Sequence, residues 1–537
     1  MRRRRRPSLF LLALLGGIGA FSVLWYVSAS GEDGGAPAFG GAYVEGLAGA
    51  PSRVNPLFAH QNAADETLAA LVFAGLTRLD DRGQAFPDLA ETWSVSTDGR
   101  SFRFRLRPGL LWQDGIPLTA ADVEFTYGLL KLPDLRARPE GSELLRGASV
   151  TATGARTVEI VLTEPFAPLP AYLTLGILPA HLLGGLDAGQ LLDAPFNQRP
   201  IGAGPYALTA LTAERALLTA NPAYHFEQPF IPNLELRFYP NEGAVIAALR
   251  EELIDGAFIS LGLNPADRVY VDRRAGLALH QLEAGEVTAI YLNQRLPIFQ
   301  DRRVRQALLQ AIDRAFIVES LLSENAAVAE SPLAGGWATT TALSRYDFDP
   351  VVAALLLDEA GWQRGRDGDR RRDGRNLSIT LSANNDPVAM AVAAEVAEKW
   401  RAVGVRVTID SVGTTALVRE RIEPRAFEAL LLAERAGADP DPYAEWHEDG
   451  VRNLTGFQDA TVDSVLEEAR QAAQPSRRKA LYDQFQDVFA RELPALPLYV
   501  STVQHVRPTS LRGVRIGSVV TPGRRFWQVQ EWSLKTR

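Results

Sequence analysis

The chain of 537 residues contains no cysteine. This absence excludes disulfide bonds, thiolate metal sites and cysteine nucleophiles, and it also excludes a lipid-modified cysteine at the end of a signal peptide. Histidine is scarce as well, and none belongs to a His-Glu-x-x-His motif, so a histidine metal site would need ligands from distant segments. The six histidines are His60, His181, His225, His280, His447 and His505. We therefore expect no metal site.

Local motifs of catalysis are missing too. There is no Gly-x-Ser-x-Gly elbow, and the glycines of Gly202-Ala-Gly-Pro205 are not followed by the Lys-Ser/Thr pair of a phosphate loop. Catalysis needs a positioned constellation of groups, and none is visible, so we expect neither an enzyme nor a cofactor. A dyad of distant acidic residues would instead make an anchored extracytoplasmic hydrolase. We keep that as the alternative, together with a sensor module.

Basic charge is in deficit over most of the chain. The formal net charge is -8 and the sequence pI is about 5.5, which disfavours a nucleic-acid partner. Hydrophobic residues make up 46% of the chain, enough for a large core. A chain of this length exceeds one compact domain and predicts two or three.

Long apolar runs are absent except near the N-terminus. Five arginines, Arg2 to Arg6, precede an uncharged and mostly apolar run from Ser8 to Ser30. About 20 apolar residues can span a bilayer, and the preceding arginines keep that end in the cytoplasm. Residues 1–30 are thus a signal peptide or an N-terminal membrane anchor, and either one exports the body. The Gly-rich residues 31–41 predict a flexible linker.

The body mixes predicted strands and helices without strict alternation, which indicates a mixed α/β and α+β fold. The alternating residues 101–107 predict a half-buried strand. Apolar residues at helical spacing predict one amphipathic helix over 301–322, and Gly361 is placed to end a helix over 349–360. The other main elements expected are a strand over 158–162, helices over 241–252, 388–403, 462–474 and 476–492, and a strand over 405–409.

Many short motifs, in order, resemble one known family: the large solute-binding proteins of peptide/nickel-type ABC transporters. The resemblance runs from about Ala42 to Trp532. Its most specific part is the block from Pro87-Asp-Leu-Ala-Glu-Thr-Trp93 to Trp112-Gln-Asp-Gly-Ile-Pro-Leu-Thr-Ala-Ala-Asp-Val-Glu124. Later motifs are Ile177-Leu-Pro-Ala-His181, Gly202-Ala-Gly-Pro-Tyr206, Asn221-Pro-Ala-Tyr224, Phe299-Gln-Asp-Arg-Arg-Val-Arg305, Leu356-Leu-Asp-Glu-Ala-Gly-Trp362 and Asp439-Pro-Asp-Pro442.

This resemblance implies a two-lobed, periplasmic-binding-protein-like fold that closes on a ligand by hinge bending. Its implied parts are a lobe I core of residues 42–54, 200–288 and 505–537, a subsidiary domain of residues 55–199, and a lobe II of residues 289–504. The hinge would lie near residues 283–293 and 499–506. The implied function is capture of a peptide-like or similar small solute, and its delivery to ABC permease subunits by a monomer.

Relatives that bind peptides hold an extended ligand between two protein strands, a mode in which main-chain bonds give the affinity. The matching segments here are residues 46–49 and 429–435. They supply Leu47, Ala48, Leu432 and Ala433 as candidate ligand-binding residues. Small residues in the first segment would let a ligand backbone approach.

Peptide-binding relatives also hold the ligand ammonium with an aspartate shortly before the Asp-Pro motif. Ala436 stands at that position here, so the peptide prediction is weakened. Glu434 is the candidate replacement, because a buried carboxylate favours a cationic partner. Four further side chains are candidates to line the cleft: Trp112, Tyr291, Trp446 and His447.

Overall fold

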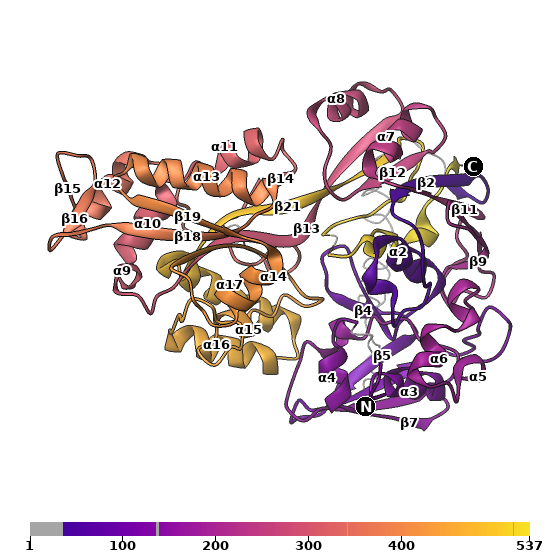
Figure 1. Cartoon of the computed structure of the whole chain (residues 1–537). Coiled ribbons are helices and arrows are strands. Elements are labelled where there is room, and N and C mark those ends of the chain that lie inside the picture. Colours follow the sequence, from indigo (N-terminus) through magenta and orange to yellow (C-terminus); the bar gives the residue numbers. More distant parts are fainter. Residues whose placement is uncertain (1–35, 136–138, 341, 519, 537) are drawn as a thin grey trace, which may run out of the picture.

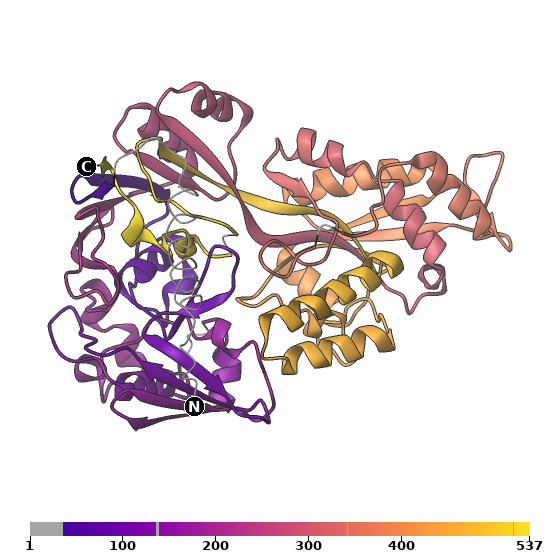
Figure 2. The ribbon, with the colours of Figure 1, turned by 180° about the vertical axis from the view of Figure 1, so that it is seen from behind.

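A computed structural model describes residues 36–135, 139–340, 342–518 and 520–536. The expected signal peptide or anchor, residues 1–30, lies outside the described residues. The molecule has two lobes joined by two long neighbouring strands, β13 (Leu277–Leu292) and β21 (Ala495–Pro508) (Figures 1 and 2). We call residues 36–276 and 509–536 lobe I, and residues 293–494 lobe II.

A single sheet of eleven strands runs through both lobes. Its strand order is β19-β18-β20-β13-β21-β12-β2-β11-β10-β9, and β14 also pairs with β21. The strands of lobe I are β2 (Ala42–Ala48), β9 (Tyr206–Leu211), β10 (Arg215–Ala220), β11 (Asn233–Tyr239) and β12 (Gly256–Ile259). Those of lobe II are β14 (Ala326–Val328), β18 (Ser378–Asn384), β19 (Arg406–Val412) and β20 (Ala429–Arg435). The expected boundaries at 288/289 and 504/505 fall inside β13 and β21, which belong to both lobes.

Lobe I also carries a four-stranded antiparallel sheet, in the order β5-β6-β8-β7, and a hairpin of β3 and β4. These strands are β3 (Thr77–Leu79), β4 (Ala85–Pro87), β5 (Ala90–Val95), β6 (Ser101–Leu106), β7 (Ser149–Gly154) and β8 (Thr157–Val161). The main helices of lobe I are α2 (Ala63–Val72), α3 (Ala120–Leu129), α4 (Ser142–Gly147), α5 (Ala180–Leu183), α6 (Ala188–Leu192), α7 (Glu242–Arg250) and α8 (Pro265–Arg273).

Helices cover the sheet of lobe II and extend below it in Figure 1. They are α9 (Pro297–Gln300), α10 (Arg302–Gln310), α11 (Arg314–Phe316), α12 (Pro350–Glu359), α13 (Pro387–Ala402), α14 (Thr414–Ala416), α15 (Tyr443–Trp446), α16 (Ala460–Gln471) and α17 (Pro475–Glu492). A small three-stranded sheet of β15 (Gln363–Arg364), β16 (Arg370–Arg372) and β17 (Arg375–Asn376) completes this lobe.

Local sequence signals correctly predicted several elements. The strand at 101–107 is β6, and its buried and exposed residues alternate. The helix at 349–360 is α12, where the Asp349 carboxylate accepts hydrogen bonds from the first-turn amides and Gly361 adopts φ +86° after the end. Gly202 is tightly packed, because a Cβ there would lie 1.9 Å from the Val72 carbonyl oxygen.

Two predictions were wrong. The helix expected over 301–322 is broken, because α10 ends at Gln310 and Asp313 starts a new helix by accepting a hydrogen bond from Phe316 N–H. That helix changes to a π-helix over Ile317–Leu321. The linker expected over 31–41 is partly a strand, since β1 (Pro37–Ala38) pairs with β22 (Lys535–Thr536) near the C-terminus.

An ionic cluster lies in the core of lobe I. Arg525 donates two hydrogen bonds to one oxygen of Glu45, at 2.8 and 2.6 Å, and the other oxygen lies 2.9 Å from His505 Nε2. All three side chains are fully buried. Burial alone would raise the pKa of Glu45, but Arg525 and His505 overcome it and hold this pKa at about 2. The cluster joins β2 to the C-terminal segment.

The two connecting strands contain a β-bulge. Glu283 pairs with Thr502 and Val287 with Val500, so Ala284, Gly285 and Glu286 stand opposite a single residue of β21. Gly285 adopts φ +67°, a conformation that favours glycine. This bulge lies between the lobes, where the backbone dihedral angles would have to change if the lobes rotated about a hinge.

Candidate functional site

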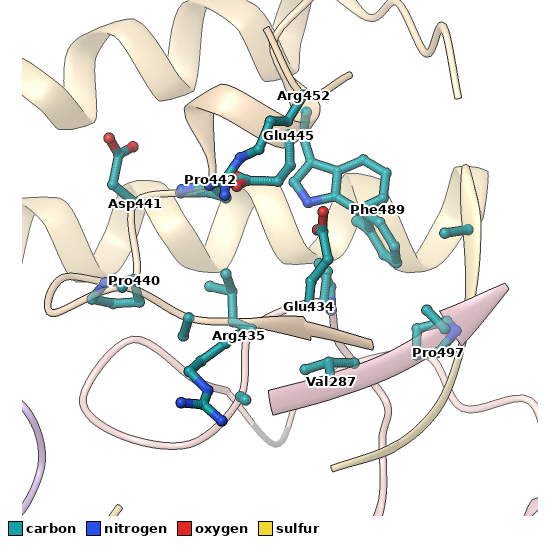
Figure 3. Close-up of a pocket in the computed structure, with 18 of the residues that line it drawn as sticks. Val287, Glu434, Arg435, Pro440, Asp441, Pro442, Glu445, Arg452, Phe489 and Pro497 are labelled. Carbon is teal, nitrogen blue, oxygen red and sulfur yellow. Dashed lines mark ion pairs between the residues drawn. The ribbon is translucent and has the colours of Figure 1, made fainter. Parts of the chain in front are cut away.

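A pocket opens where β13 and β20 meet the loop that follows β20. This loop, residues 436–442, has the sequence Ala-Gly-Ala-Asp-Pro-Asp-Pro, and we call it the Asp-Pro loop. Lobe II and the connecting strands β13 and β21 supply the pocket lining, except for Tyr172, which reaches it from lobe I. The apolar part of the lining is Val287, Ala289, Tyr291, Pro332, Leu333, Ala334, Trp446, Phe489, Ala495 and Pro497. The polar part includes Glu434, Arg435, Asp439, Asp441, Glu445 and Arg452 (Figure 3).

Glu434 points from β20 into this pocket, toward Glu445 and Arg452 (Figure 3). Its Oε2 accepts a hydrogen bond of 2.8 Å from the hydroxyl of Tyr291. Burial raises the pKa of Glu434 above its usual value, against the opposing effects of this hydrogen bond and of Arg452. Among the described residues, no cation forms an ion pair with Glu434. A basic group of a solute could therefore pair with it.

The other acidic groups of the pocket already have cationic partners. Asp441 accepts a hydrogen bond of 2.8 Å from Arg470. Asp439 is buried and accepts two hydrogen bonds from Arg478, one of them 2.9 Å long. Their charge is compensated within the protein, so their role is to hold the Asp-Pro loop in place.

Glu445 pairs with Arg452 at the side of the pocket. Burial raises the pKa of Glu445 to about 7, although Arg452 acts in the opposite direction, and the nearby Glu434 adds to the rise. Protonation of Glu445 thus falls within a physiological range of pH, and it changes the charge that Glu434 faces.

Aromatic rings form the inner wall. Tyr291 and Trp446 stack with their ring centroids 5.8 Å apart, and Trp446 meets Phe489 edge to face at 4.8 Å. The predicted cleft aromatics Tyr291 and Trp446 thus lie at the pocket. His447 does not line it: the ring is buried against Tyr443, and its Nδ1 accepts a hydrogen bond from the Asp449 amide.

One edge of β20 is largely unoccupied. On the side of β20 that faces β13, Asn293 N–H donates to Glu428 C=O and Ala436 N–H donates to Gly285 C=O. These two bonds show which residues along β20 hydrogen-bond to β13, since every second residue does so in an antiparallel pair. The main-chain groups of Ala433 therefore point away from β13. On that side β18 pairs with only Ala429 and Leu430 among the described residues. The backbone of Ala433 is thus available to an extended ligand, whereas that of Leu432 is used by β13.

The other predicted strand differs. β2 pairs with β11 along its whole length and with β12 through Leu47, so Leu47 has strands on both sides. Ala48 keeps one free side, but neither residue lines the pocket. The small residue Gly46 is explained by packing, since a Cβ there would lie 2.5 Å from Ile254. Trp112 is also distant from the pocket wall, because it is fully buried in the core of lobe I.

Sequence reasoning missed Tyr172, Glu445 and Arg452. Tyr172 belongs to a short 3₁₀ segment more than 100 residues before the rest of the lining, and its sequence has no ligand-binding motif. Glu445 lies within α15 and Arg452 lies in the turn region that follows it, so only their proximity to Trp446 could have indicated them.

The described part of the chain offers no grouping of three histidine, aspartate or glutamate side chains suited to a metal ion. Within the same residues, every helix is too short or too polar to cross a bilayer.

Comparison with known families places this geometry in context. Residues 84–450 match the family described as bacterial extracellular solute-binding proteins, family 5. The chain belongs to this family. It is therefore the solute-binding component of a peptide/nickel-type ABC importer, and a binding protein rather than an enzyme. The hydrolase alternative is set aside.

Three relatives of this family 5 protein show how far the likeness extends. Protein XP55 of Streptomyces lividans is 31% identical over 82% of this chain and 80% of its own. The oligopeptide-binding protein AppA of Bacillus subtilis is 25% identical over 99% of both chains. Its structure with a nonapeptide gives a TM-score of 0.66 and covers 93% of this chain and 100% of that one. NikZ of Campylobacter jejuni, solved with Ni(L-His), is 26% identical with a TM-score of 0.66, covering 92% and 99%.

Proposed function

We propose that this protein captures a small solute with a basic group, and that Glu434 is the counter-ion of that group. One observation carries the proposal: among the pocket acids, Glu434 is the one without a cationic partner in the described residues. A carboxylate in such a place gains most from a cation brought by the solute. The other pocket acids are neutralised by arginines of the protein.

Main-chain pairing at Ala433 would hold an extended solute beside β20. This favours short peptides, because a peptide offers both the main-chain groups and a basic group. The AppA structure contains a peptide and the NikZ structure a nickel–histidine complex, so relatives of similar identity carry both kinds of solute. With Ala436 in place of an aspartate, Glu434 is the group that we propose for the ammonium.

The test uses Glu434→Gln, which keeps the shape and the hydrogen bond from Tyr291 but removes the charge. A thermal-shift screen of di- to pentapeptides, amino sugars, oligosaccharides and nickel chelates first identifies a solute, since binding stabilises the folded protein. Calorimetry should then show an affinity loss of about tenfold or more, because a charged hydrogen bond contributes roughly 1.5–3 kcal/mol.

Glu330→Gln is the matched control, because it removes a carboxylate of lobe II that faces Arg314 rather than the pocket. Equal affinities of Glu434→Gln and the unmodified protein for a cationic solute would refute the counter-ion role.

We also propose that the body works outside the cytoplasmic membrane, as a monomer that delivers its solute to ABC permease subunits. The Arg-led segment of residues 1–30 supports export, either as a signal peptide or as an anchor. Mass spectrometry of the mature N-terminus distinguishes the two, since a chain that starts near Gly31 is incompatible with an anchor. Light scattering tests the monomer.

A further inference from the structure

The Asp-Pro loop does more than line the pocket, because it also contacts lobe I. The amide of Ala438 donates a hydrogen bond to Oε1 of Glu140, which precedes α4. The Ala438 side chain is 6% exposed and packs against Leu79 and Ala171 of lobe I. Tyr172, next to Ala171, is the lobe I residue of the pocket. One loop of lobe II therefore touches the pocket and the opposite lobe.

The loop is held rigidly before it meets lobe I. Arg478 of α17 binds Asp439, and Arg470 of α16 binds Asp441. Proline follows each aspartate and restricts the backbone further. A preorganised loop loses little conformational entropy when it docks, so a modest contact can hold it.

A second contact lies beside the first. The amide of Ala167, in lobe I, donates a hydrogen bond of 2.6 Å to the carbonyl oxygen of Arg470. The Arg470 guanidinium also lies 5.6 Å from the ring centre of Phe166. Arg470 thus braces the loop and meets lobe I at once. In Figure 1, α16 of lobe II and α4 of lobe I face each other in the lower part of the molecule, whereas α8 lies at the top.

We propose that the Asp-Pro loop is an interlobe latch, with Glu140 as its acceptor in lobe I, which keeps the lobes closed in part of the population before any solute binds. Its value for solute retention rests on the proposed function, while its existence does not. A population already closed binds more tightly, because apparent affinity scales with the fraction in the competent state. Glu140 is a positioning residue, since it acts through Ala438.

The absence of cysteine makes the test direct. Leu182→Cys in α5 and Ala473→Cys beyond α16 place two spin labels on exposed sites, one in each lobe. Pulsed EPR of the solute-free protein then gives the distribution of interlobe distances. Glu140→Ala should lower the ratio of short to long distances about tenfold or more, because a hydrogen bond to a charged group is lost and a tenfold change corresponds to roughly 1.4 kcal/mol. Glu140→Gln should retain the short distances, because its amide oxygen accepts the same bond.

Two further variants guard against misfolding and against a charge effect. Ala438→Leu enlarges the side chain that packs against Leu79 and Ala171, so it should open the lobes without touching Glu140. Glu227→Ala removes an exposed charge of lobe I away from the Asp-Pro loop and should leave the distances unchanged. The latch is refuted if Glu140→Ala keeps the original distribution, or if Glu140→Gln opens as far as Glu140→Ala. Failure of the counter-ion role would appear in calorimetry as an unchanged affinity of Glu434→Gln for the solute, and it would leave these interlobe distances as they are.

Discussion

At the scale of single residues, most charged side chains of the pocket are paired within the protein, whereas Glu434 has no ion-pair partner among the described residues. Residue type alone does not make this distinction. Glu434, chosen for its distance to the Asp-Pro motif, lies in the lining of the pocket, and its role in ligand binding stays a prediction. Trp112 was chosen for the same reason as Trp446, and it lies in the core because aromatic side chains serve packing as well as binding. Burial is set by distant segments, which a local motif does not contain.

Gly202 gives a test of the packing between the two parts of lobe I. Its amide donates to the Gln113 side chain, and a Cβ would lie 1.9 Å from the Val72 carbonyl oxygen at the end of α2. Gly202→Ala should therefore lower the free energy of unfolding by about 3 kcal/mol or more, because backbone must move. Urea denaturation measures the change.

Gly128 is the matched control for this substitution. It lies within α3, and a Cβ there meets nothing within 4 Å. Gly128→Ala should raise the free energy of unfolding by about 0.5–1 kcal/mol, since alanine favours a helix. A Gly202→Ala protein as stable as the original would contradict the tight approach to α2.

At the scale of elements, helices were more predictable than strand pairing. α12 and α13 begin at aspartates and end near glycines, so their bounds follow from neighbouring residues. The neighbours of β2 and β20 come from segments up to hundreds of residues away. The sequence therefore indicated both strands but not that β2 is flanked on both sides while β20 keeps a free edge.

The free edge of β20 leads to a prediction about main-chain binding. Ala433→Pro removes an N–H that β13 does not use, and proline is tolerated at a strand edge. We expect the affinity for an extended solute to fall about fivefold or more, the equivalent of one hydrogen bond of roughly 1 kcal/mol. Calorimetry with the solute from the thermal-shift screen measures it.

Leu432→Pro is the contrasting variant, because the Leu432 amide belongs to the ladder with β13. It should lower the melting temperature, while Ala433→Pro should change it much less. If Ala433→Pro lowered the melting temperature more than Leu432→Pro, the amide of Ala433, and not that of Leu432, would be the one bonded to β13.

At the scale of the whole molecule, buried acidic side chains lie near the contact between the lobes. Because folding raises the pKa of some of them, the stability of the protein depends on pH. Burial raises the pKa of Glu66, which faces Arg435 across the lobes, to about 7, and that of Glu445 likewise to about 7. Between the ordinary value of 4.5 and about 7, the folded protein binds more protons at these groups than the unfolded chain. The free energy of unfolding should therefore fall as pH rises through this window.

Glu445→Gln tests this linkage in one group. The variant should show a smaller fall in the free energy of unfolding between pH 5 and pH 7 than the unmodified protein, by at most roughly 3 kcal/mol. Urea denaturation at the two pH values gives the slope. A fall in Glu445→Gln as large as in the unmodified protein would mean that Glu445 is ionised over this whole range of pH and that its pKa is not raised.

The buried cluster of lobe I also constrains the order in which the chain folds. Glu45 meets its partner Arg525, 480 residues later, and Trp532 is fully buried in the same core. Lobe I is therefore incomplete until almost the entire chain has been released, whether from a ribosome or from a translocation pore. Lobe II depends only on residues between Leu277 and Pro508, so it can assemble earlier. A polypeptide threaded N-terminus first would keep its leading lobe unfinished, and hence threadable, until the last residues emerge.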